Sequence, residues 1–251
     1  MDAASGDASS LGPGEQQATP SPSRSDAYTD LGLTIPIFVL YHLGVVLLPV
    51  RNAADPVTQE LQELARGSLA LYALATVAAG ITVVLALYAI GERRSLSAGR
   101  FVAVGAEGAV YALLMRLVGG WALTALPLAS PAVAAPVDGW FSSLVMSLGA
   151  GFYEEMLFRV GLFGVGSWVI RTMVDDGDGP TTWLLVAGWA VVEAAAFSGW
   201  HHIGPGADAF DMRVFVYRAI CGVALTLVYA ARGFAPAVWT HMLYDAWVMV
   251  L

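Results

Sequence analysis

Residues 69–90 read LALYALATVAAGITVVLALYAI and contain no charged side chain. An α-helix needs about 20 predominantly apolar residues to cross the hydrocarbon core of a bilayer. This stretch therefore predicts a membrane-spanning helix. Further apolar stretches occur at residues 31–50, 101–129, 140–170, 183–200, 214–230 and 235–251. Their number and length predict an all-α fold, a polytopic transmembrane bundle of 7–8 helices.

The composition excludes several classes of protein. Of 251 residues, 57% are hydrophobic and 13% are charged, and the mean hydropathy is +0.67, which is too apolar for a typical soluble domain. The net charge is −8 and the twelve basic residues are all arginine, so a basic nucleic-acid footprint is absent and no nucleic-acid partner is expected. Membrane lipid is the expected surrounding. The single cysteine, Cys221, excludes an internal disulfide and a cysteine-based zinc site.

Two regions differ in composition. Residues 1–30 are rich in Ser, Gly, Pro, Ala and Asp and predict a disordered tail, whereas residues 31–251 form the predicted transmembrane domain. Arg93, Arg94 and Arg100 follow the second predicted helix, and positively charged loops tend to face the cytoplasm. We therefore expect a multi-pass protein of the cell membrane with a cytoplasmic N-terminus.

One predicted span is unusually long. The stretch from Trp140 to Ile170 exceeds the length of one untilted span and contains Gly161, Gly164 and Gly166. It predicts either one tilted helix or two pieces. The choice decides between seven and eight helices.

Three polar clusters lie inside the apolar segments of the C-terminal half. A charged side chain at the bilayer centre costs about 2.5–3.5 kcal/mol on insertion scales, so each cluster needs an explanation. The clusters read GFYEEMLFR at 151–159, FSGWHH at 197–202 and HMLYD at 241–245. Polar groups in such positions indicate a functional site inside the bundle.

In the first cluster, helical spacing separates two neighbouring acids. Glu155 and Arg159 are four residues apart, so they share one face and can neutralise each other. Glu154 points elsewhere and is free to face a polar cavity. The alternative is that all three side chains stabilise the helices without doing chemistry.

The other two clusters repeat this spacing with histidine. Phe197 and His201 share a helix face, as do His241 and Asp245. A carboxylate that holds one imidazole nitrogen serves both general bases and metal ligands, whereas a lone histidine is more often a packing or interfacial residue. Together the three clusters supply the groups that activate a water molecule and stabilise an oxyanion.

The three motifs resemble those of the CPBP family of intramembrane proteases, which includes the CAAX prenyl endopeptidases and bacteriocin-processing enzymes. The family pattern is EExxxR, then FxxxH, then HxxxN or HxxxD on successive membrane helices. This chain has EExxxR at 154–159, FxxxH at 197–201 and HxxxD at 241–245. The resemblance covers residues 140–251.

The resemblance implies an endopeptidase that hydrolyses a peptide bond within the membrane plane, in eukaryotic relatives after a prenylated cysteine. The implied substrate is a membrane-anchored or lipidated protein or peptide. Glu154 and His201 would bind and deprotonate the attacking water, and His241 with Asp245 would stabilise the tetrahedral oxyanion. The implied role of Glu155 and Arg159 is to shape the site. The implied site thus consists of Glu154, Glu155, Arg159, His201, His241 and Asp245.

No cofactor is firmly implied by the resemblance, and metal-free water activation is the preferred interpretation. Zinc held by Glu154, His201 and His241 remains the alternative. Asp245 departs from the commoner asparagine: an ionised aspartate only accepts hydrogen bonds, so we expect it to orient His241 or to bind a metal ion rather than to donate to the oxyanion.

Two rival functions remain. In a small transporter or a proton or ion channel, intramembrane charges would line a path. The charges in question are Glu107, Arg116, Glu154, Glu193 and Arg218. A catalytically inactive membrane scaffold or immunity protein is the second rival. Glu193 is otherwise expected to pair with Arg218 or Arg116, and His42 to be a hydrogen-bonded packing residue.

Overall fold

The structure is a computed structural model that describes residues 27–48, 51–65, 67–90, 96–125, 139–174, 177–204 and 207–250. The predicted tail up to residue 26 lies outside the described residues, as do Arg93 and Arg94, on which the predicted orientation rests.

The described residues form helices and no strands, as predicted. The elements are α1 (Ala27–Leu47), α2 (Val57–Leu64), α3 (Leu69–Ile90), α4 (Ala98–Ala125), α5 (Trp140–Gly149), η1 (Ala150–Glu154), η2 (Met156–Gly164), α6 (Val165–Met173), α7 (Pro180–Trp200), α8 (Met212–Arg232) and α9 (Phe234–Val250). The elements from α5 to α6 follow one another without interruption as one long helix, so this part of the chain contains eight helices. The predicted all-α fold is confirmed, and the long stretch is one helix rather than two pieces. The predicted stretches therefore form seven helices, and the eighth is the short helix α2, which was not predicted.

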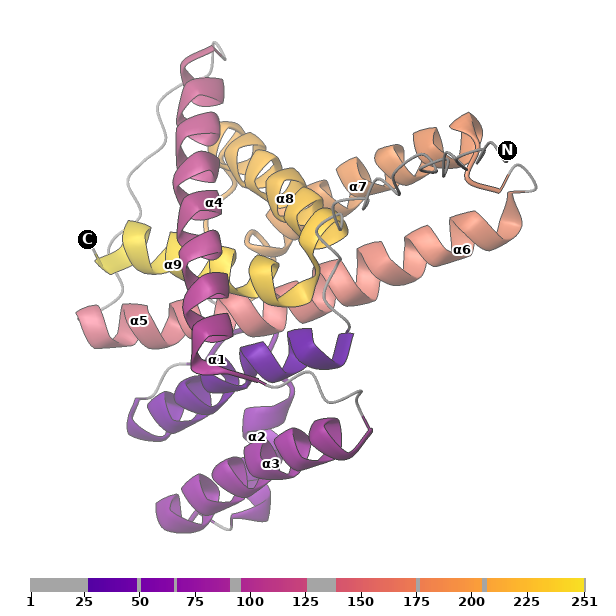
Figure 1. Ribbon diagram of the computed structural model, residues 1–251. Coiled ribbons are helices and arrows are strands. Elements are labelled where there is room, and N and C mark those ends of the chain that lie inside the picture. Colours follow the sequence, from indigo (N-terminus) through magenta and orange to yellow (C-terminus); the bar gives the residue numbers. More distant parts are fainter. Residues whose placement is uncertain are drawn as a thin grey trace, which may run out of the picture.

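In Figure 1 the long helix runs across the molecule, with α1, α2 and α3 below it and α7 and α8 above it. The closest neighbours are α4 with α9, α7 with α8, α1 with α3 and α5 with α9. A buried apolar cluster where α1, α5 and α9 meet includes Ile37, Tyr41, Val145, Leu148 and Val238. This packing fixes α9 against the helix that carries the first polar cluster.

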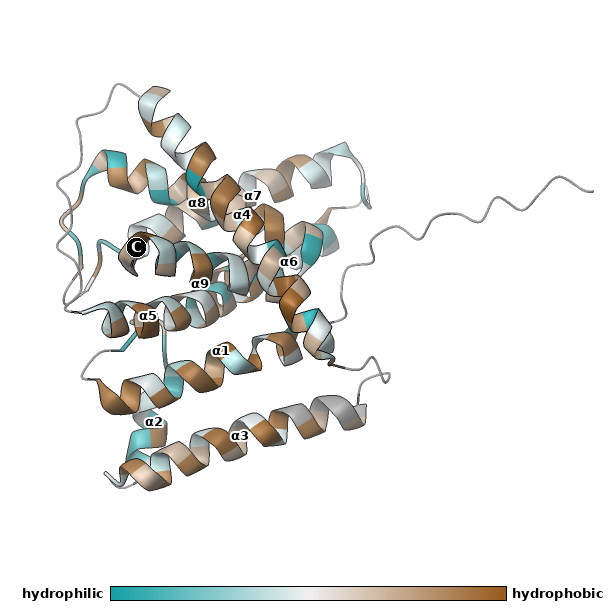
Figure 2. Ribbon diagram, turned by 60° about the vertical axis from the view of Figure 1, so that its left-hand side comes forward, coloured by the Kyte–Doolittle hydropathy of each residue, from teal (hydrophilic) through white to brown (hydrophobic). Residues whose placement is uncertain are grey.

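The outward-facing sides of the helices are apolar, as expected for a surface in contact with lipid. Four helices, α1, α4, α7 and α8, are long and apolar enough to cross a membrane. Figure 2 shows hydrophobic residues along α3 and α4, where Leu74, Ile81, Val102 and Leu117 are exposed. Exposed apolar surface of this extent is favourable only in a nonpolar surrounding.

The first helix begins at Ala27, before the predicted boundary at Leu31. Asp30 is buried, and its carboxylate accepts a hydrogen bond from the backbone N–H of Phe234 at 2.5 Å. The start of α9 has backbone N–H groups without partners inside the helix, and this contact satisfies one of them. The last residues assigned to the tail therefore belong to the folded bundle.

The first polar cluster lies on π-helical turns, which the sequence pattern does not predict. Two π-helical segments, η1 and η2, flank Glu155, and π-helical turns often occur at functional sites. Gly151 in η1 packs directly on α9: a Cβ atom there would lie 2.7 Å from the Met242 Cβ and 2.9 Å from the Val238 carbonyl oxygen. Glycine therefore permits the contact between these two elements.

Candidate active site

The three polar clusters meet at one cavity of about 400 Å³. Glu154, His201, His241 and Asp245 all line it, although they come from η1, the end of α7 and α9. The remaining lining is largely apolar. It includes Met115, Met146, Ala150, Phe197, Val214, Leu225, Val248 and Met249. A few polar groups thus converge in an otherwise apolar cavity, which is typical of ligand-binding and active sites.

Glu154 presents one carboxylate oxygen to a partner and the other to the cavity wall. Its side chain is 7% exposed, and Oε1 accepts a hydrogen bond from Nδ2 of Asn52 at 2.8 Å. Oε2 lies 3.7 Å from Nε2 of His201 and has no hydrogen-bond partner among the described residues. A buried carboxylate oxygen without a protein partner can accept a hydrogen bond from a water molecule.

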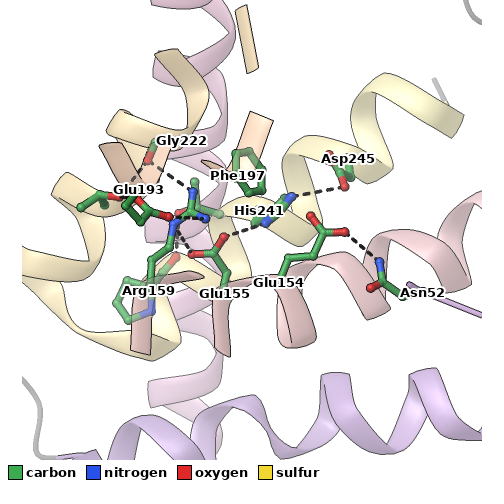
Figure 3. Close-up of polar contacts among 12 residues, drawn as sticks. Asn52, Glu154, Glu155, Arg159, Glu193, Phe197, Gly222, His241 and Asp245 are labelled. Carbon is green, nitrogen blue, oxygen red and sulfur yellow. Dashed lines mark hydrogen bonds and ion pairs between the residues drawn. The ribbon is translucent and has the colours of Figure 1, made fainter. Parts of the chain in front are cut away.

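Glu155 and Arg159 form the ion pair that the spacing predicts, within a larger buried network (Figure 3). Arg159 Nε lies 3.3 Å from Glu155 Oε2, and Arg159 Nη1 lies 3.3 Å from Glu193 Oε1. All three side chains are fully buried. Glu193 Oε2 also accepts a hydrogen bond from the Thr226 hydroxyl at 2.7 Å. The network joins the long helix to α7 and α8.

The observed partner of Glu193 corrects one prediction. Glu193 pairs with Arg159, not with Arg218 or Arg116. Arg218 instead pairs with Asp208 at 2.6 Å, and the guanidinium of Arg116 lies over the Trp247 ring. Helical spacing relates residues on one helix, whereas these partners come from different helices, so the sequence pattern did not identify them.

His201 lies directly after α7, where its ring orientation is fixed by a backbone contact. Its Nδ1 lies 3.0 Å from the Phe197 carbonyl oxygen. A carbonyl oxygen only accepts, so Nδ1 carries a proton and Nε2 of the neutral ring is an acceptor that faces Glu154. The Phe197 ring contacts the rings of His201 and His241 and lies under the Arg159 guanidinium. Phe197 thus separates the buried ion network from the cavity.

Both ring nitrogens of His241 face carboxylates. Nδ1 lies 2.8 Å from Glu155 Oε1, and Nε2 lies 3.5 Å from Asp245 Oδ2. The contact with Asp245 is the one that the spacing predicts. The contact with Glu155 is additional, and it ties the position of His241 to the Arg159 network.

The donor set for a metal ion is not assembled. Among the residues that the structure describes, no group of three or more His, Cys, Asp or Glu side chains is arranged to hold a metal ion. Of the predicted ligands, Glu154 and His201 approach each other, but His241 faces two other carboxylates. The arrangement therefore does not fit zinc held by Glu154, His201 and His241.

Sequence reasoning missed Asn52, which comes from the segment between α1 and α2. It is 4% exposed, lines the cavity and donates to Glu154. It is the only asparagine in the sequence. A single buried carboxamide just after a membrane helix is a weak signal, because only the structure reveals that it reaches the first cluster.

His42, the other polar residue discussed for the N-terminal half, is a packing residue as predicted. Its ring nitrogens lie 2.9 Å from the Tyr72 hydroxyl and 2.6 Å from the Tyr153 hydroxyl. It does not line the cavity that contains the three clusters.

Comparison with known proteins gives one match. The family described as Type II CAAX prenyl endopeptidase Rce1-like matches residues 136–247. This range contains all three polar clusters and excludes Asn52. A search of curated proteins and a search of solved structures found no match.

Proposed function

From the match of residues 136–247 to the Rce1-like type II CAAX prenyl endopeptidases, which supports membership of the CPBP family, we propose that the chain is an intramembrane endopeptidase. In this proposal Glu154 and His201 activate a water molecule, and His241 with Asp245 stabilises the oxyanion. Glu155 and Arg159 hold the site in shape.

One observation carries the proposal. Glu154 Oε2 and His201 Nε2 are 3.7 Å apart at the wall of the cavity, and both accept hydrogen bonds when the His201 ring is neutral with its proton on Nδ1. A water molecule beside them can donate one hydrogen to each, which orients its oxygen lone pairs toward the cavity. No such arrangement exists at Glu155, which faces His241 and Arg159.

The reaction then follows from these positions. The water oxygen forms a bond to the carbonyl carbon of the substrate while its proton passes to Glu154. The carbonyl oxygen becomes an oxyanion, which hydrogen-bond donors in the cavity stabilise. The carbon–nitrogen bond breaks as Glu154 returns the proton to the leaving amine. Water is consumed and two peptide fragments form.

His241 is the proposed oxyanion donor. A ring whose two nitrogens face Glu155 and Asp245 is suited to carrying hydrogen on both, because carboxylates only accept. Asp245 therefore orients the ring, as its chemistry predicts for an aspartate at this position. The 3.5 Å contact with Asp245 is long, so the Nε2 hydrogen can also be shared with a developing negative charge in the cavity.

The proposal uses no metal ion. Zinc would need three donors directed at one point, and His241 instead faces the Glu155 and Asp245 carboxylates. Cleavage that resists strong chelators would support this part of the proposal, whereas loss of cleavage on chelation and recovery with zinc would contradict it.

A membrane-anchored or lipidated peptide is the proposed substrate. The cavity wall is mostly apolar and carries several methionines, which are flexible enough to pack against varied aliphatic chains. The description of the matched family, CAAX prenyl endopeptidase, suggests a peptide that carries a prenylated cysteine. A cytoplasmic N-terminus, inferred from the arginines that follow the second helix, remains part of the proposal.

The transporter alternative is weaker. Among its candidate charges, Glu107 is paired with Arg232 at 2.5 Å, and Glu193 is paired with Arg159. Only Glu154 and Arg218 of that set line the cavity. Charges neutralised in separate places do not form a path. An inactive scaffold would have no need for a carboxylate oxygen left without a partner beside a histidine.

The substrate class can be identified in cells. Membrane proteins from cells that carry the parent chain or Glu154→Ala would be compared by peptide mass spectrometry. We expect uncleaved lipidated proteins to accumulate in the variant, with the same set accumulating in His201→Ala. Identical peptide profiles in the parent and both variants would contradict the protease assignment.

A further inference from the structure

A buried polar network connects the segment after α1 to the proposed active site. It lies outside residues 136–247, which match the family. Its members are Tyr41, Asn52, Asp55 and Thr58, all 5% exposed or less. The network ends at Glu154 through the Asn52 carboxamide.

The orientation of the Asn52 carboxamide is fixed by its own hydrogen bonds. Its Oδ1 accepts from the Ala54 backbone N–H at 2.8 Å, which leaves Nδ2 to donate to Glu154 Oε1 at 2.8 Å. Its backbone N–H donates to the Tyr41 hydroxyl at 2.9 Å. Exchange of the amide oxygen and nitrogen would break both side-chain contacts, so the donor side faces Glu154.

The loop that carries Asn52 is fixed by hydrogen bonds among Tyr41, Asp55 and Thr58. The Tyr41 hydroxyl donates to Asp55 Oδ2 at 2.9 Å, and Asp55 Oδ1 accepts from the backbone N–H of Val57 at 2.8 Å and of Thr58 at 3.0 Å. The Thr58 hydroxyl also donates to Asp55. Asp55 thus caps the start of α2 and also accepts a hydrogen bond from the Tyr41 hydroxyl, which in turn accepts one from the Asn52 backbone N–H.

We propose that Asn52 is a positioning residue for Glu154, which rests on the proposed function of Glu154 as the base. Its amide holds Oε1, so that Oε2 is directed at His201 and the water. The 136–247 segment therefore does not contain the complete site: the loop between α1 and α2 supplies the donor that fixes the carboxylate.

A hydrogen bond to a charged group contributes more than one between neutral groups, and a freely rotating carboxylate would rarely present Oε2 to His201. The role acts on catalysis rather than on substrate binding. It predicts a lower kcat with little change in KM when the donor is lost, together with full membrane accumulation if the loop keeps its fold.

Asn52→Asp is the sharpest test because it preserves the side-chain volume and the Oδ1 acceptor and replaces the donor with a second carboxylate oxygen that faces Glu154. With a fluorogenic peptide carrying a farnesylated cysteine before its last three residues, we expect kcat to fall about 10- to 100-fold at pH 7. Gln62→Ala, which removes an exposed carboxamide on α2, is the matched control and should leave kcat unchanged.

The pH dependence separates positioning from a structural role. The carboxyl group introduced by Asn52→Asp can donate again when protonated, so the ratio of variant to parent rates should rise as pH is lowered. The other titratable and charged groups around Glu154 and Asn52 are present in both proteins. They are His201, Tyr217, Arg218, Cys221, His241, Tyr244 and Asp245 in the cavity lining, with Tyr41 and Asp55 behind Asn52. The corresponding Asn52→Ala ratio should not rise. Parallel ratios for both variants would overturn the proposal.

A second measurement needs no substrate. In detergent, Asn52→Asp should lower the Tm by about 3 °C or more through repulsion between two carboxylates, and this decrease should vanish in a Glu154→Gln background. Equal decreases in Tm in the parent and Glu154→Gln backgrounds would contradict the contact between Asn52 and Glu154. Full cleavage by Glu154→Gln would instead contradict the proposed function, and an inactive Glu154→Gln with a fully active Asn52→Asp would contradict only the role of Asn52.

Discussion

Glu155 Oε1 lies 2.8 Å from Nδ1 of His241, so the second acid of the EExxxR motif holds the histidine of the third motif. The same carboxylate contacts Arg159 through Oε2. Adjacent acids on one helix therefore serve different purposes: Glu154 faces the cavity, and Glu155 connects two helices.

This relationship predicts the effect of Glu155→Gln. The amide keeps the volume, but it removes the negative charge that faces both His241 and Arg159. We expect kcat on the farnesylated peptide to fall and the Tm in detergent to decrease together, with no change in which bond is cleaved. A variant with a lower Tm and unchanged kcat would mean that Glu155 does not act through His241.

The Arg159 network should dominate the stability of the C-terminal half. Arg159→Met leaves Glu155 and Glu193 buried without their cation, which is expected to destabilise the protein by about 3–5 kcal/mol. Glu155 keeps its contact with His241, so adding Glu193→Gln removes the buried charge that depends on Arg159 alone among these contacts and should restore part of the loss. Chemical unfolding in detergent measures both steps. A double variant less stable than Arg159→Met would contradict this explanation.

Close packing of η1 on α9 predicts a size limit at Gly151. Gly151→Ala adds a methyl group 2.7 Å from the Met242 Cβ, which is expected to destabilise the protein by about 1–3 kcal/mol and to displace His241 from Glu155. Gly188→Ala on α7 is the matched control, because a methyl group added there would meet no atom within 4 Å among the described residues. Equal activity and Tm for both variants would show that the contact with α9 is not tight.

Asp55 gives a pH-dependent prediction outside the membrane helices. Burial raises the pKa of its carboxyl group, but hydrogen bonds from Thr58 and Val57 lower this pKa by a larger amount. The net pKa is therefore below its usual value. The stability that the ionised group contributes is therefore complete above the unfolded pKa of about 4 and is lost as pH falls through the lower folded pKa.

The matching variant is Asp55→Asn. The Tm difference between the parent and Asp55→Asn should stay constant from about pH 5 to pH 7 and shrink below about pH 4. A difference that instead disappears between pH 7 and pH 5 would contradict the assignment of the pH effect to Asp55.

Much of the fold was predictable because apolar length is a strong local signal. The predicted stretch 69–90 coincides with α3, and 183–200 lies within α7. The short helix α2 was missed because its sequence, VTQELQEL, is not apolar. Local spacing also gave the contacts of Glu155 with Arg159 and of His241 with Asp245, since each pair lies one turn apart.

Contacts between helices were not predictable from spacing. The pairing of Glu193 with Arg159 and the contact of Asn52 with Glu154 join positions far apart in the sequence. Both depend on how the helices cross, which is set by packing rather than by local periodicity. The π-helical turns around Glu155 were not predicted from the sequence pattern either.

The role of Glu154 as the base is the central claim, and cleavage of the farnesylated peptide by purified Glu154→Gln tests it most directly. The amide keeps the shape of the side chain but cannot take the proton from water, so we predict a decrease in kcat of about 10²- to 10⁴-fold with the Tm largely retained. Glu60→Gln, an exposed acid on α2, is the matched control and should cleave like the parent. Cleavage by Glu154→Gln at the rate of the parent would contradict the claim.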